Sequence, residues 1–199
     1  MYKYVIKRIL DIILAILLLP FFLVITILIG PLIYLEDRGK IFYNANRLGK
    51  NGKVFVMYKF RTMKENSPDI RNSDGSTYNA EDDERVTKIG KFLRKLSIDE
   101  VPQILNVLKG EMSFIGPRPD LPEHINLYTK EEKQKLKVRP GITGFNQAYY
   151  RNSIRWKNRI KNDIYYINNI SLILDIKIFI RTIISLFKTE NRYINQFYK

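Results

Sequence analysis

The sequence predicts an α+β fold, mostly helical, with an N-terminal re-entrant membrane helix, a small β-hairpin and a compact helical domain that carries interfacial amphipathic helices. Three observations support this prediction: a charge-free apolar run, an Asn-Gly turn between two β-rich runs, and apolar residues at helical spacing through the second half. We divide the chain into a membrane anchor, residues 1–38, and a globular domain, residues 39–199, whose last helix is interfacial.

The apolar run extends from Ile12 to Leu35. As a straight helix its 24 residues would measure about 36 Å, which exceeds the roughly 30 Å hydrocarbon core of a bilayer. Pro20 lies near its middle and Pro31 near its end, and an interior proline removes one backbone hydrogen bond from a helix. Basic residues flank both ends, so two cytoplasmic ends, and hence a re-entrant helix, satisfy the positive-inside rule best. An ordinary kinked span remains open.

Asp11 lies directly before this run. A carboxylate at the edge of an apolar segment is costly in lipid unless it is paired. We expect its partner to be Lys7, one turn earlier, or Arg8.

The hairpin follows the anchor. Residues 41–43 and 54–60 are rich in β-branched and aromatic side chains, and Asn51-Gly52 between them is a strong hairpin signal. Residues 64–84 are polar and contain Asn, Ser, Pro, Asp and Gly, which predicts a loop.

Helices are predicted for much of the remaining chain. Apolar residues recur at helical spacing from Val86 to Leu96, and a second helix runs from Asp99 to about Leu108, with Gly110 as its end signal. Two further helices are expected at residues 131–137 and 154–166.

The last predicted helix, residues 170–188, is amphipathic. Its polar face contains Asp175, Lys177, Arg181 and Lys188. Its apolar face contains Leu172, Ile173, Ile176, Phe179, Ile180, Ile183, Ile184 and Phe187. An apolar face bordered by Lys and Arg favours a helix that lies in the membrane interface, although a core helix of the globular domain shows the same pattern.

Composition limits the chemistry. The formal net charge of +14 indicates anionic partners, which include nucleic acid, phospholipid and phosphorylated substrates. The chain has no cysteine, which excludes disulfides and thiolate metal sites, and His124 is its only histidine. Catalysis would therefore depend on carboxylates, Lys, Arg or Tyr.

Asp99 and Glu100 form the most informative pair. Pro102 is tolerated in the first turn of a helix, so it favours Asp99 as the N-cap, and both carboxylates then lie at the start of the helix. The two acids cannot face each other across a sugar as a glycosidase pair does. They can both bind one Mg²⁺ ion together with phosphate oxygens, or one of them can attack phosphorus. Simple capping of a helix is the alternative.

Three basic segments can supply phosphate contacts. Pro117 and Pro119 stiffen the backbone on either side of Arg118, and arginine suits bidentate phosphate binding. Arg139 precedes a second Pro-Gly element, and Lys59 and Arg61 end the second predicted strand. Each signal is weak alone, and their occurrence beside an acid pair and an anchor strengthens them.

Ordered blocks along nearly the whole chain carry a family resemblance. The blocks are Lys7–Asp11, Tyr58–Met63, Ser97–Gln103, Asn106–Gly110, Met112–Pro119 and Val138–Gly144. With them, the chain resembles the small monotopic phosphoglycosyl transferases of bacteria, which begin glycan assembly on undecaprenyl phosphate. One departure concerns the anchor, since the Ser-Pro pair that often breaks the membrane helix in this family is replaced by Leu23-Val24.

The resemblance implies a Mg²⁺-dependent, two-step transfer at the bacterial inner membrane, with a monotopic anchor and the catalytic domain on the cytoplasmic face. Asp99 would be the nucleophile toward a UDP-sugar, and both acids are candidate metal ligands; Glu100 would assist either through the metal or as a base toward the acceptor. The phosphosugar would then pass to undecaprenyl phosphate. The residues expected to bind substrate are Lys59, Arg61, Arg94, Pro117, Arg118 and Arg139.

Further partners follow from the same interpretation. We expect membrane phospholipid as a partner, allow a homodimer, and expect no nucleic acid. A membrane-anchored nucleic-acid binder is the main alternative, since the charge and 13 tyrosines permit base stacking, but the basic residues are scattered and no nucleic-acid motif is present. A non-catalytic scaffold that grips anionic lipid is the other alternative.

Overall fold

The computed structural model describes residues 1–72, 78, 80, 82–151 and 153–187. Within these residues the chain is mostly helical, with one two-stranded antiparallel hairpin and one short parallel pair. The predicted combination of an N-terminal apolar helix, a small hairpin and a helical remainder is confirmed.

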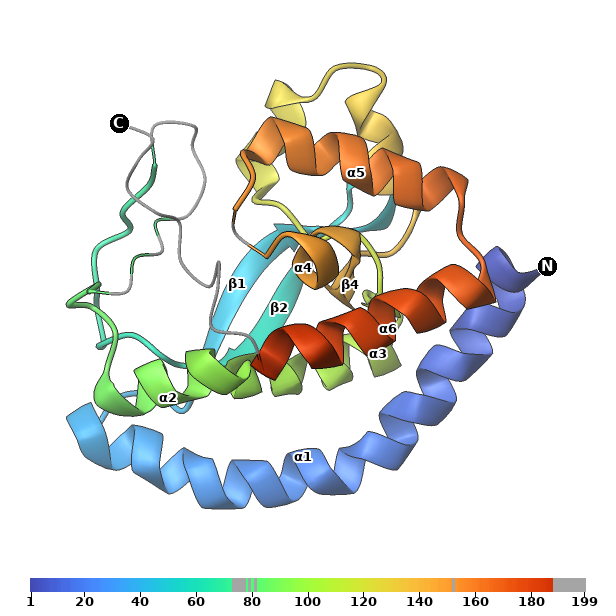
Figure 1. Ribbon diagram of the computed structural model, residues 1–199. Helices are drawn as coiled ribbons and strands as arrows, with labels where there is room; N and C mark the ends of the chain where they lie inside the picture. Colours follow the sequence, from blue (N-terminus) through green and yellow to red (C-terminus); the bar gives the residue numbers. More distant parts are fainter. Residues whose placement is uncertain (73–77, 79, 81, 152, 188–199) are drawn as a thin grey trace.

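Helix α1, Lys7–Asp37, follows a short π-helical turn and is continuous through Pro20 and Pro31. It is apolar all round, yet one face is buried against the rest of the protein, through Ala15, Phe22 and Ile33. The segment from Tyr2 to Asp37 is the one described helix long and apolar enough to cross a membrane. Figure 1 shows α1 as a bowed helix along one edge of the protein, with its convex side away from the other elements.

Asp11 does not form the ion pair predicted with Lys7 or Arg8. Its carboxylate accepts hydrogen bonds from the backbone N–H of Phe114 at 3.0 Å and from Ser113 Oγ at 3.1 Å. Lys7 instead donates to Asp175, 2.6 Å away. The prediction failed because the partners come from segments more than one hundred positions away, which local spacing does not reveal.

The hairpin pairs β1, Phe42–Leu48, with β2, Val54–Phe60, from Phe42 opposite Phe60 to Leu48 opposite Val54. Its turn uses left-handed backbone at Asn51 (φ 59°) and Gly52 (φ 74°), as the Asn-Gly signal predicts. The buried side chains Ala45, Phe55, Met57 and Phe60 pack with α1 and the short helices that follow, whereas Leu48 at the end of β1 packs with Tyr128 and Trp156.

Two helical segments and a strand lead away from the hairpin. Helix α2, Lys88–Leu96, is capped by Thr87, whose hydroxyl accepts the N–H of Gly90. A 3-10 segment, Ile98–Gln103, continues into α3, Ile104–Lys109. Sequence analysis predicted one α-helix here; the first half is 3-10 because Pro102 lacks an N–H for an i−4 bond. Ser97, in left-handed backbone (φ 57°), precedes it instead of an Asp99 cap.

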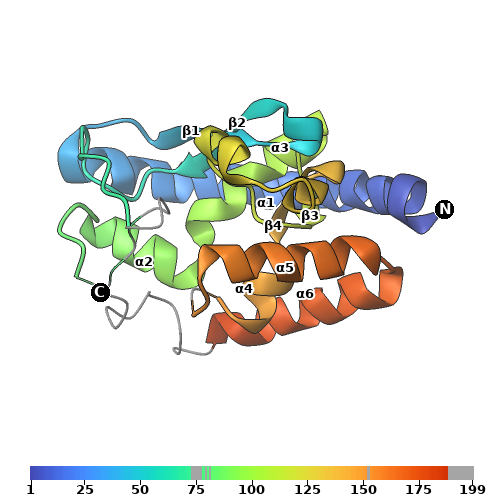
Figure 2. The ribbon, with the colours of Figure 1, turned by 90° about the horizontal axis from the view of Figure 1, so that it is seen from above.

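The remaining described elements form the second half of the molecule. Strands β3, Ser113–Ile115, and β4, Gly141–Thr143, make a parallel pair that sequence analysis did not predict. Helix α4, Phe145–Tyr149, lies between α5, Trp156–Asn168, and α6, Leu172–Phe187 (Figure 1). Figure 2 shows α1 along one side of the molecule, with α5 and α6 on the other. Two 3-10 segments precede β4: Pro122–Leu127 and Glu132–Lys137.

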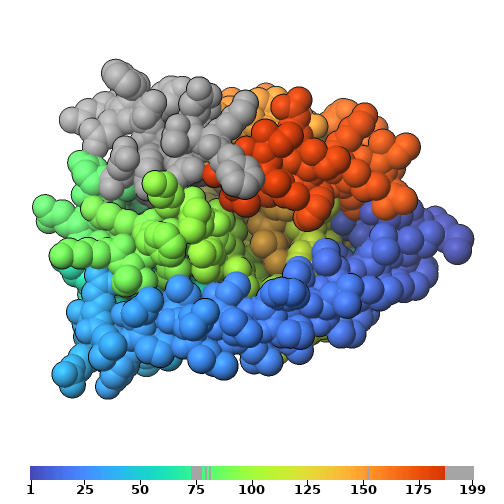
Figure 3. All heavy atoms as spheres, turned by 60° about the horizontal axis from the view of Figure 1, so that its bottom comes forward, coloured from blue at the N-terminus to red at the C-terminus, as the bar shows by residue number. Residues whose placement is uncertain are grey.

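Helix α6 exposes the apolar face that the sequence predicts. Ile173 is 67% exposed, and the neighbouring apolar side chains of this face from Leu172 to Ile184 are exposed as well. Asp175 corrects the expected polar face, because it is buried and accepts hydrogen bonds from Tyr2, Lys7 and Tyr166. Lys188 lies outside the described residues. In Figure 3, α1, α2 and α6 share one face of the molecule.

Candidate active site

Asp99 and Glu100 lie near the start of the 3-10 segment that follows α2. Gly90 permits this placement, because a Cβ there would lie 2.1 Å from the carbonyl oxygen of Thr62, just beyond the end of β2. The N–H of Thr87 donates to that same carbonyl at 3.1 Å. Helix α2 therefore packs directly on the strand extension and delivers Asp99 and Glu100 to the side of β2.

Asn106 fixes the other side of this junction. It is fully buried on α3, its amide nitrogen donates to Val56 O at 2.7 Å, and its amide oxygen accepts from Tyr58 N at 3.0 Å. The side chain thus satisfies backbone groups of β2 as a neighbouring strand would. This contact sets the register between β2, which carries Lys59, and the acid pair.

Glu100 is held by two cations. Its Oε1 accepts from Lys59 Nζ at 2.6 Å and from Arg118 Nη2 at 3.0 Å. Burial opposes ionisation of Glu100, but Arg118 and Lys59 outweigh it and lower the pKa of this carboxyl. Glu100 is therefore a fixed anion.

Asp99 differs from its neighbour. Its side chain is 12% exposed, Lys59 Nζ is 3.7 Å from its Oδ2, and no described residue donates a hydrogen bond to it. Burial raises the pKa of Asp99 and the charge of Glu100 adds to this, while Lys59, Arg94 and Arg118 oppose it. The result is a carboxylate in a cationic environment whose lone pairs are not engaged.

Arg118 reaches the pair through the parallel strands. The N–H of Gly116 donates to Thr143 O, and the N–H of Gly141 donates to Pro117 O, both at 2.9 Å. A Cβ on Gly144 would lie 2.0 Å from the carbonyl oxygen of Gly116, so the two Pro/Gly segments can approach this closely only as glycines. The pairing fixes the loop that presents Arg118, whose side chain is 46% exposed.

The structure divides the predicted substrate-binding residues. Lys59 and Arg118 contact the pair, Pro117 fixes the Arg118 loop, and Arg94 lies close enough to lower the pKa of Asp99 while donating to Thr62 Oγ1 at 2.9 Å.

Two predicted substrate-binding residues lie elsewhere. Arg61 forms a bidentate ion pair with Asp37 at 2.5 and 2.6 Å, where it closes the end of α1. Arg139 donates to Gly110 O at 2.7 Å, beyond the far end of α3. Sequence position suggested both, because their neighbours belong to the site, but the pleat of β2 and the length of α3 carry them away from the acid pair.

Arg47 was missed by sequence analysis. Near the end of β1, it lies beside the Arg118 loop, since the next residue, Leu48, donates its N–H to Asp120 O at 2.8 Å. Burial lowers the pKa of Arg47, and the charges of Arg118 and Arg71 add to this effect. Its position just before the predicted hairpin turn was the signal in the sequence that could have identified Arg47.

A metal at this site would have few protein ligands. Within the described parts of the chain, no group of three or more His, Cys, Asp and Glu side chains is placed to hold a metal ion. Asp99 and the second oxygen of Glu100 can supply two carboxylate ligands. That donor set fits Mg²⁺ when phosphate oxygens and water complete its coordination.

Known proteins are similar in sequence to this chain. The model of the bacterial sugar transferase family matches residues 2–189. The uncharacterized sugar transferase EpsL of Bacillus subtilis is 42% identical over 90% of this chain and 86% of its own length. The UDP-glucose:undecaprenyl-phosphate glucose-1-phosphate transferase of Caulobacter vibrioides is 39% identical over 94% and 72%.

A longer relative matches over part of its length. The UDP-N-acetylgalactosamine-undecaprenyl-phosphate N-acetylgalactosaminephosphotransferase of Aeromonas hydrophila is 40% identical over 89% of this chain and 43% of its own. The match to the family model and the extent of these similarities agree with the fold and the acid pair: the chain belongs to the bacterial sugar transferase family.

Proposed function

We propose that this protein transfers a phosphosugar from a UDP-sugar to undecaprenyl phosphate, the first membrane step of a bacterial glycan. The observation that carries the proposal is the asymmetry of the acid pair: Glu100 is neutralised by Lys59 and Arg118, while Asp99 accepts no hydrogen bond from the described residues. The names of the relatives, which include glucose and N-acetylgalactosamine transferases, support the class of donor and acceptor. They differ in sugar, so the sugar used here stays open.

The proposed reaction has two displacements at one phosphorus. A carboxylate oxygen of Asp99 attacks the β-phosphate, which bears the sugar; the bond from this phosphorus to the oxygen that bridges the two phosphates breaks, and UMP leaves. An oxygen of undecaprenyl phosphate then attacks the same phosphorus, and the bond to Asp99 breaks to restore the carboxylate. Once Asp99 is ionised, no proton has to be removed from the nucleophile, so the first step needs no separate base.

The cations have separate roles in this scheme. Lys59 lies between the two carboxylates and would stay with the phosphoryl group as negative charge moves toward the leaving UMP. Arg118, on its stiff loop, and Arg94 would bind the diphosphate. Mg²⁺ held by Asp99, Glu100 and phosphate oxygens would supply further charge neutralisation.

The membrane arrangement is also a proposal. Lys7 at the start of α1 forms an ion pair with Asp175, and Asp37 at its end forms one with Arg61. Both ends of the apolar helix are therefore bound to the globular part of the protein. A span would place these ends on opposite sides of the bilayer. We infer a monotopic protein on the cytoplasmic face of the bacterial inner membrane, with α1 re-entrant and the apolar face of α6 in the interface.

Trapping the intermediate tests the chemistry. The full chain, incubated with a UDP-sugar and Mg²⁺ but without acceptor, should release UMP and gain the mass of one phosphosugar on Asp99, located by peptide mass spectrometry. Glu123→Gln, which changes an exposed acid with no contact in the described structure, should label equally. A phosphosugar on another residue, or UMP release that is undiminished in excess chelator, would contradict the nucleophile or the metal respectively.

Cysteine labelling tests the topology. Because the chain has no cysteine, Tyr4→Cys and Lys40→Cys place a single thiol before or after α1. Neither should react with a membrane-impermeant maleimide in intact cells, and both should react after the inner membrane is permeabilised. Labelling of one of the two from outside would establish a kinked span instead.

A further inference from the structure

A cationic hollow lies at the start of α1, away from the acid pair. Of the residues that line it, six carry positive charge: Lys3, Lys7, Arg8, Lys50, Lys137 and Arg139. They come from the π-helical turn before α1, the first turn of α1, the hairpin turn, and the segment before β4. The carboxylate in its lining is Asp11, whose Oδ1 accepts from Ser113 and Phe114.

Most of this positive charge is not neutralised by the described protein. Asp175 pairs with Lys7 at 2.6 Å. Arg8 donates to the carbonyls of Val107 and Leu108, and Arg139 donates to that of Gly110, so both guanidinium groups converge on the last turn of α3. These carbonyls carry only the partial negative charge of a helix C-terminus.

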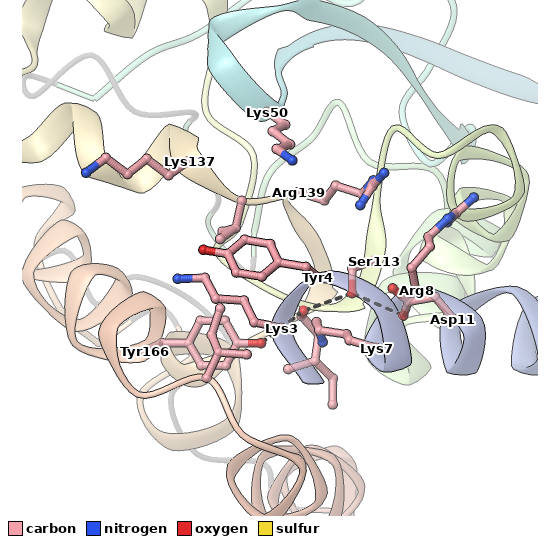
Figure 4. Close-up of a pocket in the computed structure, with 13 residues that line it drawn as sticks. Lys3, Tyr4, Lys7, Arg8, Asp11, Lys50, Ser113, Lys137, Arg139 and Tyr166 are labelled. Carbon is pink, nitrogen blue, oxygen red and sulfur yellow. Dashed lines mark hydrogen bonds between the residues drawn. The ribbon is translucent and has the colours of Figure 1, made fainter. Parts of the chain in front are cut away.

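Three lysines complete the excess, and the first of them, Lys3, donates to the carbonyl oxygen of Ile167 at 2.9 Å. Lys50 and Lys137 are exposed, and their side chains make no hydrogen bond or ion pair with any residue that the structure describes. In Figure 4, Lys50 extends from the hairpin turn toward Arg139, whose guanidinium points toward Arg8. Cations gathered without carboxylate partners indicate an anionic ligand, and guanidinium groups favour phosphate.

The position of the hollow identifies the source of the phosphate. It adjoins the charged first turns of α1, directly before the charge-free run begins at Ile12, where exposed apolar side chains follow at Ile13, Ile16 and Leu17. A helix in a bilayer places such a boundary at the level of the lipid headgroups. The ligand is therefore expected to arrive with the membrane.

The hollow is separate from the reacting centre. The 3-10 segment that contains Asp99 begins at Ile98 and α3 ends at Lys109, so the path from Asp99 to the end of α3 measures about 17 Å along these helices. A phosphate bound at Arg8 and Arg139 cannot contact a group attached to Asp99. We propose that this hollow binds the phosphate of a membrane lipid as a second, non-reacting site, and thereby holds the start of α1 at the membrane surface.

Native mass spectrometry tests the proposal. The full chain in neutral detergent is titrated with phosphatidylglycerol, with phosphatidylcholine, or with inorganic phosphate. One phosphatidylglycerol should be retained in preference to phosphatidylcholine. The double variant K50Q/K137Q, which breaks no contact of the described structure, should bind it about 25-fold more weakly, at about fivefold for each cation lost near an anionic headgroup.

Matched controls separate this site from bulk charge and from catalysis. K130Q/K161Q removes two exposed lysines outside the hollow and should bind phosphatidylglycerol as the wild type does. Asp99→Asn should also retain the lipid, so the outcome does not depend on the proposed reaction. Equal weakening in both double variants, or no preference between the lipids, would overturn the proposal. So would stabilisation by inorganic phosphate without retained lipid, which would assign the hollow to a soluble anion.

Discussion

The protein contains two clusters built from the same three groups, a lysine and two carboxylates. Behind the Arg118 loop, Lys135 is buried between Asp120 at 2.5 Å and Asp163 at 3.0 Å. Although burial opposes its charge, the two carboxylates raise the pKa of Lys135. In the candidate active site, Lys59 lies in the same way between Asp99 and Glu100.

The two clusters differ in how completely their carboxylates are hydrogen-bonded. Asp120 also accepts from Tyr128 Oη and Trp156 Nε1, and Asp163 accepts from Asn146. Asp99 has no such donors among the described residues. A buried charge network stabilises a fold only when each member is satisfied, so the incomplete cluster is the one that we propose for substrate binding.

Removing the carboxylate of Asp99 should produce the largest effect on turnover. Asp99→Asn is expected to lower the rate of UMP release by about 10⁴-fold or more, as loss of a nucleophile does. Its melting temperature should stay the same or rise, because burial already disfavours the charged form of Asp99. Asp163→Asn is the matched variant in the other cluster, and it should lose stability while each folded molecule keeps its turnover within about tenfold. The reverse pattern would exchange the roles of the two clusters.

Removing the lysine should lower the stability of the protein much more at Lys135, whose carboxylate partners are fully hydrogen-bonded, than at Lys59. Lys135→Met leaves two buried carboxylates uncompensated and should lower the free energy of unfolding by about 3–5 kcal/mol. Lys59→Met, nearer to solvent, should cost about 1 kcal/mol or less. Denaturant titration in neutral detergent measures both, and equal losses would mean that Lys59 is chiefly structural.

The pH dependence of turnover should report the charge on Asp99. Because the pKa of Asp99 is raised, the pH below which the rate falls should lie above the usual pKa of an aspartate. The rate falls there because a protonated carboxyl cannot attack phosphorus. Lys59→Met removes a charge that lowers this pKa, so the fall in rate should move to higher pH. An unchanged position of this fall would show that a group other than Asp99 titrates.

Arg118→Lys should give the smallest effect. A lysine keeps the positive charge beside Glu100 but loses the planar pair of donors. The expected result is a fall of about tenfold in kcat/KM for the UDP-sugar with an unchanged melting temperature, since the side chain is 46% exposed. A drop in melting temperature would place Arg118 with the structural cluster.

Local signals in the sequence predicted much of this fold. The Asn51-Gly52 turn, the spacing in α2 and the apolar face of α6 depend on neighbours within a few residues, and the structure agrees with each. The β3–β4 pair was missed because three-residue strands show no alternation and their partners lie far apart in sequence.

The spatial grouping of the candidate site residues was predicted only where chain neighbours are also neighbours in space. Asp99 and Glu100 are adjacent, and Arg118 follows them on a stiff loop. Arg61 was assigned to phosphate because it lies two residues after Lys59, but it contacts Asp37 instead. The hydrogen bonds to Asp120 and Asp163 distinguish the structural cluster from the candidate site. Their donors lie far away in the sequence, so no local pattern predicts them.

Asp11 links the apolar helix to the strand that precedes the Arg118 loop, through one carboxylate oxygen that accepts from both Ser113 and Phe114. Strand β3 ends at Ile115, and the loop begins at Gly116. These hydrogen bonds tie the position of the Arg118 loop to α1 through one short strand. Under the proposed reaction, in which the donor arrives from water and the acceptor from lipid, this connection sets where the two substrates can meet.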